Sequence, residues 1–343
     1  MGRIGRAAFL ALVAAAPALA EEPVAASLLD RCWTPQKLTA TTSEAKPARA
    51  RNKLDLPRLR QEPVAAATPI PEAQRGSIRS VELPPGEKLI ALTFDLCEAD
   101  GTIAGYDGRI VDLLRAEAVK ATFFVSGKWM ESHTERTAQL LADPNFELGA
   151  HGFRHLDMAR LSGQALQDEI VLTEAAYARA RNSLLANDCA MPGAETALPE
   201  RLALLRFPFG TCNAAALQAA AEHGQLAIQW DVVTGDPDPG RSAKAIAATI
   251  LGKAHPGAIV VAHANGRGRN TADALTLAIP KLKAEGYRFV TVSELLAAGK
   301  PVIAQACYLD HPRVATRVAR PPRRKQQQQQ QQQNVFRLFG PAN

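Results

Sequence analysis

Several charged or imidazole side chains follow short apolar runs between residues 89 and 297, where they could carry out acid–base or metal chemistry. Asp95 ends one such run, Arg206 a second and His263 a third. A carboxylate that faces a cleft can act as a general base, and an imidazole can exchange a proton near neutral pH. Alone, an Asp or His at a strand end is more often a turn former or a structural residue. The functional interpretation therefore depends on a fold that brings these side chains together.

His151 and His155 are four residues apart and follow an apolar run that resembles a strand. On a helix this spacing puts both imidazoles on one face, close enough to bind a single divalent ion. The alternative is a pair of unrelated surface histidines. Because the chain has only seven histidines, we interpret the pair as metal ligands.

Apolar runs typical of buried strands alternate with segments of helical periodicity from residue 89 to residue 298. Such alternation predicts a parallel α/β sheet or barrel, whose sites lie at the carboxyl ends of the strands. Strands are predicted at 89–94, 121–125, 146–150, 204–206, 226–230, 258–262 and 289–292, and helices at 109–116, 135–141, 166–182, 214–222, 243–251, 272–285 and 293–298.

Five segments in fixed order resemble the motifs of the polysaccharide deacetylase family, also called the NodB-homology or carbohydrate esterase family 4 domain. The resemblance implies a distorted (β/α) barrel of about seven strands. It also implies a metal-dependent hydrolase of carbon–nitrogen bonds other than peptide bonds, with zinc the expected ion. The segments are Thr93-Phe94-Asp95, His151-Gly152-Phe153-Arg154-His155, Arg206-Phe207-Pro208-Phe209-Gly210, Trp230-Asp231 and Val261-Ala262-His263.

The resemblance also implies a role for each matching residue. Asp95 would be the general base that deprotonates the attacking water, and Arg206 would hold its carboxylate in orientation. His263 would be the general acid that protonates the leaving amine. Phe209 stands where the family has Tyr, and its backbone N–H would help to stabilise the oxyanion, so the change of side chain need not cost activity.

Two family acids are replaced in this chain. The family's second Asp, a metal ligand, is Leu96 here. Glu98 is the predicted substitute, with a water or the nearby Cys97 and Asp100 as alternatives. Because the family includes members that read Thr-Phe-Asp-Leu-Cys-Glu, we interpret this as a variant site.

The family's other missing acid lies three residues after the Trp of the fourth motif and supports the catalytic His. That position is Val233 here. Asp231 lies on the same side of an extended strand as Val233 and is the predicted replacement. Asp236 is predicted to cap the next turn.

Four segments are predicted along the chain. Residues 1–20 have a short basic start, an apolar run and a small-x-small cleavage pattern, as a signal peptide does. Residues 21–88 are expected to be a poorly ordered extension or linker, and residues 89–305 the catalytic domain. Residues 306–343 form a basic, glutamine-rich tail that is expected to be disordered.

The positive net charge of +6 belongs to the ends of the chain, because residues 21–310 sum to about −3. This distribution argues against a nucleic-acid partner. No transmembrane segment is expected in the mature chain. An exported protein, periplasmic or extracellular, with a peptidoglycan-like or other N-acetylated polysaccharide as its substrate fits these features.

Five cysteines are present, so at least one has no partner within a monomer. The barrel interpretation places Cys97 and Cys212 at the mouth that carries the site, and we predict that they pair. A second bridge is predicted between Cys32 and Cys307, with Cys189 free.

Two other functions remain open at this stage. The loss of two family acids favours a catalytically impaired relative that binds carbohydrate. A deacylase of a small non-glycan amide or ester is the other alternative, because motif spacing does not describe the shape of the cleft.

Overall fold

The computed structural model describes residues 27–49 and 54–308. The predicted signal peptide at 1–20 and all but the first residues of the predicted tail lie outside this part of the chain. Among the described residues no helix is both long and apolar enough to cross a membrane.

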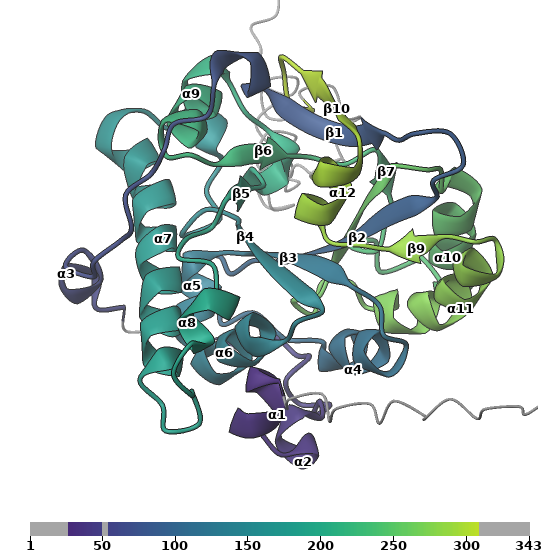
Figure 1. Ribbon diagram of the computed structural model, residues 1–343, viewed down its shortest axis with the longest axis horizontal. Coiled ribbons are helices and arrows are strands. Elements are labelled where there is room, and N and C mark those ends of the chain that lie inside the picture. The colour runs from purple at the N-terminus through teal and green to yellow at the C-terminus, as the bar shows by residue number, and fades with distance from the viewer. Residues whose placement is uncertain (1–26, 50–53, 309–343) are drawn as a thin grey trace, which may run out of the picture.

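A ten-stranded sheet curls around a central axis, with helices packed on its outer face (Figure 1). The strand order is β10-β1-β6-β5-β4-β3-β2-β8-β7, and β9 also pairs with β2. All pairings are parallel except that of β1 with β10. The strands are β1 Ser77–Glu82, β2 Leu89–Leu96, β3 Ala121–Val125, β4 Phe146–Ala150, β5 Leu204–Leu205, β6 Leu226–Ile228, β7 Val232–Val233, β8 Ile259–His263, β9 Arg288–Phe289 and β10 Lys300–Ala304.

The helices cover the strands much as the alternating pattern predicts. Two short helices, α5 and α8, and the 3₁₀ turns η2 and η3 occupy segments for which the sequence predicted neither a helix nor a strand. The helices after β2 are α4 Gly108–Ala116, α5 Gly127–Ser132, α6 Thr134–Ala142, η2 Met158–Arg160, α7 Gly163–Leu185, α8 Ala194–Ala197, η3 Pro208–Gly210, α9 Ala214–Glu222, α10 Ala243–Lys253, α11 Thr271–Ala284 and α12 Val292–Ala298.

Side chains alternate between the inside and the outside of the curled sheet, because successive residues of a strand point to opposite faces. On β2, Leu89 and Ala91 pack in the inner cluster, whereas Ile90 and Leu92 pack under the outer helices. The inner cluster also contains α12, through Val292 and Leu295. Its strand residues are Ile78, Val81, Leu89, Ala91, Phe124, Leu204, Ile228, Ile259 and Val261.

The curled sheet is an incomplete barrel. Its ring of β1, β6, β5, β4, β3, β2 and β8 agrees with the predicted barrel of about seven strands. A single antiparallel bridge between Ser80 and Ala258 brings β1 back to the start of β8. Gly257 makes this approach possible, because a Cβ at that position would lie 1.7 Å from the carbonyl oxygen of Val81.

Part of the segment predicted as an extension belongs to the sheet. Residues Ser77–Glu82 form β1, whose inward side chains Ile78 and Val81 are buried. Upstream of β1 lie α1 Leu28–Cys32, α2 Pro35–Leu38, α3 Leu56–Leu59 and η1 Glu72–Gln74. These pieces are too short for periodicity to reveal, and tertiary packing rather than local propensity accounts for them.

The predicted disulfide pairing is wrong. Cys32 pairs with Cys189, and Cys212 pairs with Cys307, while Cys97 is a buried free thiol. The first bridge fastens the N-terminal helix α1 to the segment after α7. The second fastens the segment after β10 to the loop that follows Arg206.

Candidate active site

The motif residues meet inside the barrel because each stands at a position whose side chain points to the inner face of the sheet. Position 95 continues the inward set of β2, and position 263 that of β8, directly opposite in the register of the two strands. Positions 151 and 206 follow the inward positions of β4 and β5 in the same way. The parallel strands therefore deliver all four side chains to one end of the barrel.

Asp95 and Arg206 form a buried ion pair, with 2.9 Å between Oδ1 and the guanidinium. Arg206 is fully buried and also donates hydrogen bonds to the carbonyl oxygens of Ile228 and Gln229. Burial alone would raise the pKa of Asp95, but the nearby His151, Arg206 and His263 outweigh it and hold that pKa below its usual value. Asp95 is therefore a carboxylate of fixed orientation at neutral pH.

The two histidines of the second motif meet in a turn rather than on a helix. Gly152 and His155 both have positive φ angles, 69° and 56°, and the ring centroids of His151 and His155 are 5.0 Å apart. His151 Nδ1 donates a hydrogen bond to the carbonyl oxygen of Arg206 (2.8 Å), which leaves Nε2 to face the site, 3.5 Å from Asp95 Oδ2. Burial lowers the pKa of both imidazoles, to about 3 for His155, which favours the neutral form that metal binding requires.

Cys97 completes a group of three metal-binding atoms. The ligand atoms of Cys97, His151 and His155 all lie within 4.8 Å of one another, and all three residues are buried. The side chain of Leu96 points outward and packs in the core beneath the helices. Cys97, two positions after Asp95, points to the same side as Asp95. Asn265 Nδ2 donates hydrogen bonds to the carbonyl oxygen and Sγ of Cys97 (2.9 and 3.0 Å). One cysteine sulfur and two imidazoles form a donor set that suits a divalent transition-metal ion.

Glu98, the predicted third ligand, does not lie at this site. Its carboxylate accepts hydrogen bonds from the backbone of Ala104 and from Ser132 Oγ, at 3.0 and 2.7 Å. Lys128 lies 4.0 Å away from it. Glu98 has the opposite parity to Asp95, and it ties the loop after β2 to α5.

His263 is supported by Asp236 and not by the predicted Asp231. Asp236 Oδ1 accepts a hydrogen bond from His263 Nδ1 (2.9 Å), and Oδ2 accepts bonds from the His263 backbone and Thr271 Oγ1, both at 2.7 Å. Burial lowers the pKa of His263, but Asp236 and Asp95 more than offset it, so the pKa lies above its usual value. Nδ1 carries a proton, and the raised pKa favours a second proton on Nε2.

Asp231 contacts the start of β8 instead of His263. It pairs with His255 Nε2 at 2.6 Å and accepts a hydrogen bond from the backbone of Ile259 (3.0 Å). Asp231 therefore fixes the beginning of β8, at the end opposite His263. The chain turns after β7, and this turn brings Asp236 to His263.

Phe209 lies at the rim of the site with a side chain that is 60% exposed. Its φ of 62° is unusual for a residue with a bulky side chain, and such strain is often found at functional sites. Its ring packs edge-on against His155, with centroids 4.5 Å apart. An exposed aromatic ring beside the two histidines offers an apolar surface to a ligand.

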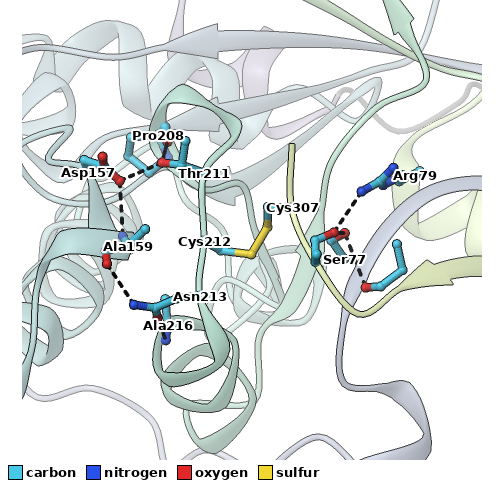
Figure 2. Close-up of a disulfide and its surroundings, with 12 residues drawn as sticks. Ser77, Arg79, Asp157, Ala159, Pro208, Thr211, Cys212, Asn213, Ala216 and Cys307 are labelled. Atoms are coloured by element: carbon cyan, nitrogen blue, oxygen red, sulfur yellow. Dashed lines mark hydrogen bonds between the residues drawn. A yellow bond between two sulfur atoms is a disulfide. The ribbon is translucent and has the colours of Figure 1, made fainter. Parts of the chain in front are cut away.

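The loop that carries Phe209 is fastened on both sides (Figure 2). Thr211 Oγ1 donates a hydrogen bond to Asp157 (2.6 Å), and Cys212 forms the bridge to Cys307. Next to Cys307, Tyr308 donates its backbone N–H to the carbonyl oxygen of Gly210 (3.0 Å) and stacks on Trp230. The first residues of the predicted tail thus hold the active-site loop.

Glu169 on α7 is a positioning residue that the sequence did not reveal. Its buried carboxylate accepts hydrogen bonds from the backbone N–H groups of Arg154 and Leu156, on both sides of His155. A Cβ at position 152 would lie 2.9 Å from Glu169 Oε2, which explains why glycine stands where the family has Ser or Thr. No local signal marks Glu169, because it lies in the middle of a long helix.

Comparison with known proteins agrees with this architecture. Residues 82–228 match the profile of the family described as polysaccharide deacetylase. A peptidoglycan N-acetylglucosamine deacetylase of Bacillus cereus is 33% identical over 219 residues, which are 63% of this chain and 91% of that protein. A peptidoglycan N-acetylmuramic acid deacetylase of Bacillus subtilis is 28% identical over 61% of this chain and 72% of its own length.

Solved structures share the fold. A peptidoglycan N-acetylglucosamine deacetylase aligns with a TM-score of 0.54 and 27% identity, over 68% of this chain and 99% of that one. A pseudoenzyme of carbohydrate esterase family 4 from Bacillus anthracis aligns with a TM-score of 0.53 and 26% identity, over 66% of this chain and 70% of that one.

The fold is an incomplete (β/α) barrel with a buried polar site at the carboxyl ends of its strands. The chain belongs to the polysaccharide deacetylase family, the NodB-homology or carbohydrate esterase family 4 group. It is thereby placed among the hydrolases that act on carbon–nitrogen bonds other than peptide bonds.

Proposed function

We propose that this protein is an exported, metal-dependent deacetylase that removes N-acetyl groups from N-acetylhexosamine units of peptidoglycan. The observation that carries the proposal is the buried arrangement in which two pairs, Asp95–Arg206 and His263–Asp236, flank the Cys97, His151 and His155 cluster. Its relatives include deacetylases of both N-acetylglucosamine and N-acetylmuramic acid in peptidoglycan.

In the proposed reaction water attacks the acetamide carbonyl, the carbon–nitrogen bond breaks, and acetate and a free sugar amine leave. Asp95 takes a proton from the attacking water while Arg206 holds its carboxylate still. His263 gives the proton on Nε2 to the departing nitrogen, and Asp236 stabilises the charged imidazole before transfer. The Phe209 backbone N–H contributes to binding the oxyanion. A divalent ion held by Cys97, His151 and His155, with zinc proposed, would polarise the carbonyl and activate water.

The domain assignment and export belong to the same proposal. We propose residues 1–20 as the signal peptide, with a mature protein in the periplasm or outside the cell. The catalytic domain is proposed for residues 89–305, supplemented by β1, and the glutamine-rich tail is assigned no catalytic part. A site that acts on peptidoglycan requires a location outside the cytoplasm, where Cys32–Cys189 and Cys212–Cys307 can also form.

The direct test is acetate release from a panel of acetylated substrates, with and without a chelator. Peptidoglycan fragments, chito-oligosaccharides, acetylated xylan and a small aryl acetamide together distinguish a glycan deacetylase from a deacylase of small molecules. We expect release from the N-acetylated glycans that a chelator abolishes and zinc restores. Release only from the small amide, or release unaffected by the chelator, would contradict the proposal.

A catalytically impaired relative is the second candidate, because a pseudoenzyme of the same family shares the fold. Leu96 and Val233 remove two family acids, which favours this alternative. The positions of Cys97 and Asp236 favour catalysis, since each places a suitable group where a lost acid would have acted. Glycan binding by a folded protein without zinc uptake and without acetate release would establish the second candidate.

The Asp236–His263 pair makes the pH dependence of the reaction testable. A general acid works in its protonated form, so activity should fall as the pH rises through the raised pKa of His263. Asp236→Asn removes the negative charge that raises the pKa of His263 and weakens the hydrogen bond that also raises it. The charge of Arg267, which lowers this pKa, remains. We therefore expect the alkaline limb of kcat to move to lower pH.

Asp231→Asn is the matched control for this shift. It also removes one carboxylate near β8, but its partner is His255 rather than His263. Its alkaline limb should coincide with that of the wild type. If kcat of a folded Asp236→Asn variant falls at the same alkaline pH as kcat of the wild type, His263 is not the acid whose titration limits turnover.

A further inference from the structure

A basic cavity of about 670 Å³ lies beside the active site. Its lining includes the loop that follows His263 and the N-terminal segment around residue 46, which pack against each other. Lysine and arginine side chains dominate its charged lining. These are Lys46, Arg109, Arg267 and Arg269, together with the single acid Asp107.

The cavity and the general acid share one loop. A Cβ at Gly268 would lie 2.4 Å from Asp236 Oδ2 and 2.6 Å from the carbonyl oxygen of His263. The charge of Arg267 is close enough to contribute to the pKa of His263, which it lowers. A sugar next to the one whose acetamide is cleaved would therefore come within reach of this lining.

Most of the cavity's positive charge is not neutralised by the protein. Arg109 forms two hydrogen bonds to Asp107, at 2.9 and 2.8 Å, so those two charges balance. Within the described chain no carboxylate lies within 4.0 Å of the charged nitrogens of Lys46, Arg267 or Arg269. Because residues 21–310 have a net charge of about −3, this excess is a local feature.

The wall formed by the N-terminal segment is fixed in place. Glu44 pairs with Arg136 on α6, and Ala48 forms a bridge to Ile103. The carbonyl oxygen of Ala45 packs so closely on Gly266 that a Cβ there would lie 2.2 Å from it. The cavity therefore exists before any ligand binds, which lowers the entropic cost of binding.

We propose that Lys46, Arg267 and Arg269 form a subsite for a carboxylate carried by the glycan next to the scissile acetamide. This inference rests on the proposed function and names the chemical group of the peptidoglycan substrate that the cavity would bind. Guanidinium groups bind carboxylates through paired, charge-assisted hydrogen bonds. In peptidoglycan the carboxylate has two alternative sources. A muramic acid without a stem has a free lactyl carboxylate, whereas a muramic acid whose lactyl carboxyl is amide-linked to a peptide stem offers only the carboxylates of the stem.

The test compares Arg267→Gln/Arg269→Gln with wild type on three substrates. These are neutral N-acetylglucosamine oligomers, glycan strands stripped of peptide, and glycan strands that retain the stem. We expect KM for the strands that carry the bound carboxylate to rise about tenfold, equivalent to about 1.4 kcal/mol. Loss of the Arg267 charge should raise the pKa of His263 further, so the assays are run at a pH below that pKa, where His263 is protonated in both proteins. There we expect kcat on the carboxylated strands to stay near wild type, and both constants for the neutral oligomers to match the wild type. Lys253→Gln is the control. It removes an exposed charge at the end of α10, before β8 begins, and should match the wild type on all three substrates.

The two sources of the carboxylate give different results. If the lactyl carboxylate binds, KM rises only on strands stripped of peptide, because the stem is joined to that carboxyl by an amide bond. If a carboxylate of the stem binds, KM rises only on strands that retain peptide. Equal effects of the double variant on neutral and carboxylated substrates would overturn the subsite. That result differs from a failure of the proposed function, in which the wild type would release acetate from no glycan. Calorimetry on the Asp95→Asn variant, with and without Arg267→Gln/Arg269→Gln, measures the change in affinity for the same strands in the absence of turnover.

Discussion

Asp95→Asn is expected to lower kcat by about 10² to 10⁴ while the protein keeps its metal. The loss has this size because a side-chain amide cannot take the proton of the attacking water, and general-base catalysis contributes a factor of this order. The metal remains because Asp95 is not among the three clustered ligand atoms. Acetate release at saturating substrate and zinc content per chain are the two measurements.

The fold of this variant must be checked, because Asp95 is the partner of the fully buried Arg206. Removing one member of a buried ion pair commonly costs 3 to 5 kcal/mol, although Asn still offers an oxygen to the guanidinium. Thermal unfolding with zinc bound shows whether the variant is intact at the assay temperature. A folded, zinc-loaded Asp95→Asn enzyme with near-normal kcat would mean that another group is the base.

The pH dependence of stability gives this site a second signature. The folded-state pKa of Asp95 is depressed, so its pair contributes stability above the ordinary carboxyl pKa and loses it as the pH falls through the folded value. The raised pKa of His263 has the opposite effect, since its contribution is complete below the ordinary imidazole pKa and is lost as the pH rises through the folded value. The metal-free protein should therefore be destabilised at both ends of the range.

The barrel and the meeting of four motif residues could be predicted because both depend on local patterns. Buried strands show as apolar runs, and a polar residue that ends such a run lies at the carboxyl end of the sheet. Asp95, His151, Arg206 and His263 all satisfy this rule. Strand β1 escaped prediction because its six residues carry little hydrophobic signal and its partners β6 and β10 are distant in sequence.

The geometry differs from the predictions for Glu98 and Asp231 for two different physical reasons. Cys97 was within reach of sequence reasoning, because a residue two positions after Asp95 has the same strand parity, whereas Leu96 and Glu98 have the other. Asp236 was not, because the chain leaves β7 through a turn before it reaches His263, and no periodicity describes a turn. Asp231 lies next to the Trp of the fourth motif, but its carboxylate binds the backbone of Ile259 on the neighbouring strand β8 and not His263.

The disulfides could not be derived from spacing. Their partners are 157 and 95 residues apart, and their proximity depends on how the chain ends wrap around the barrel. Placing Cys97 and Cys212 at the same mouth did not make them partners. Asn265 holds Cys97 toward the histidines, whereas Cys212 meets the segment that follows β10.

Cys97→Ala is expected to weaken zinc binding by at least about 10²-fold, with a comparable loss of acetate release at limiting zinc. Changes to groups that merely support a ligand cost 10- to 100-fold in affinity, so losing a ligand should cost at least as much. Cys97→Asp supplies a carboxylate and should recover part of the affinity. Glu98→Gln is the matched control and should bind zinc like the wild type, because Glu98 contacts Ala104 and Ser132 instead.

Cobalt substitution makes the thiolate itself visible. A cobalt ion bound through sulfur shows a thiolate charge-transfer band, which should be present in wild type and Glu98→Gln and absent from Cys97→Asp. Burial and the nearby Asp95 raise the pKa of the Cys97 thiol to about 12 in the metal-free protein, so metal uptake near neutral pH should release a proton. A wild-type cobalt spectrum without that band, or full zinc affinity in Cys97→Ala, would show that the two histidines bind the ion without the thiol. The residue two positions after the general base would then be structural, and a water would take the place of the family's carboxylate ligand.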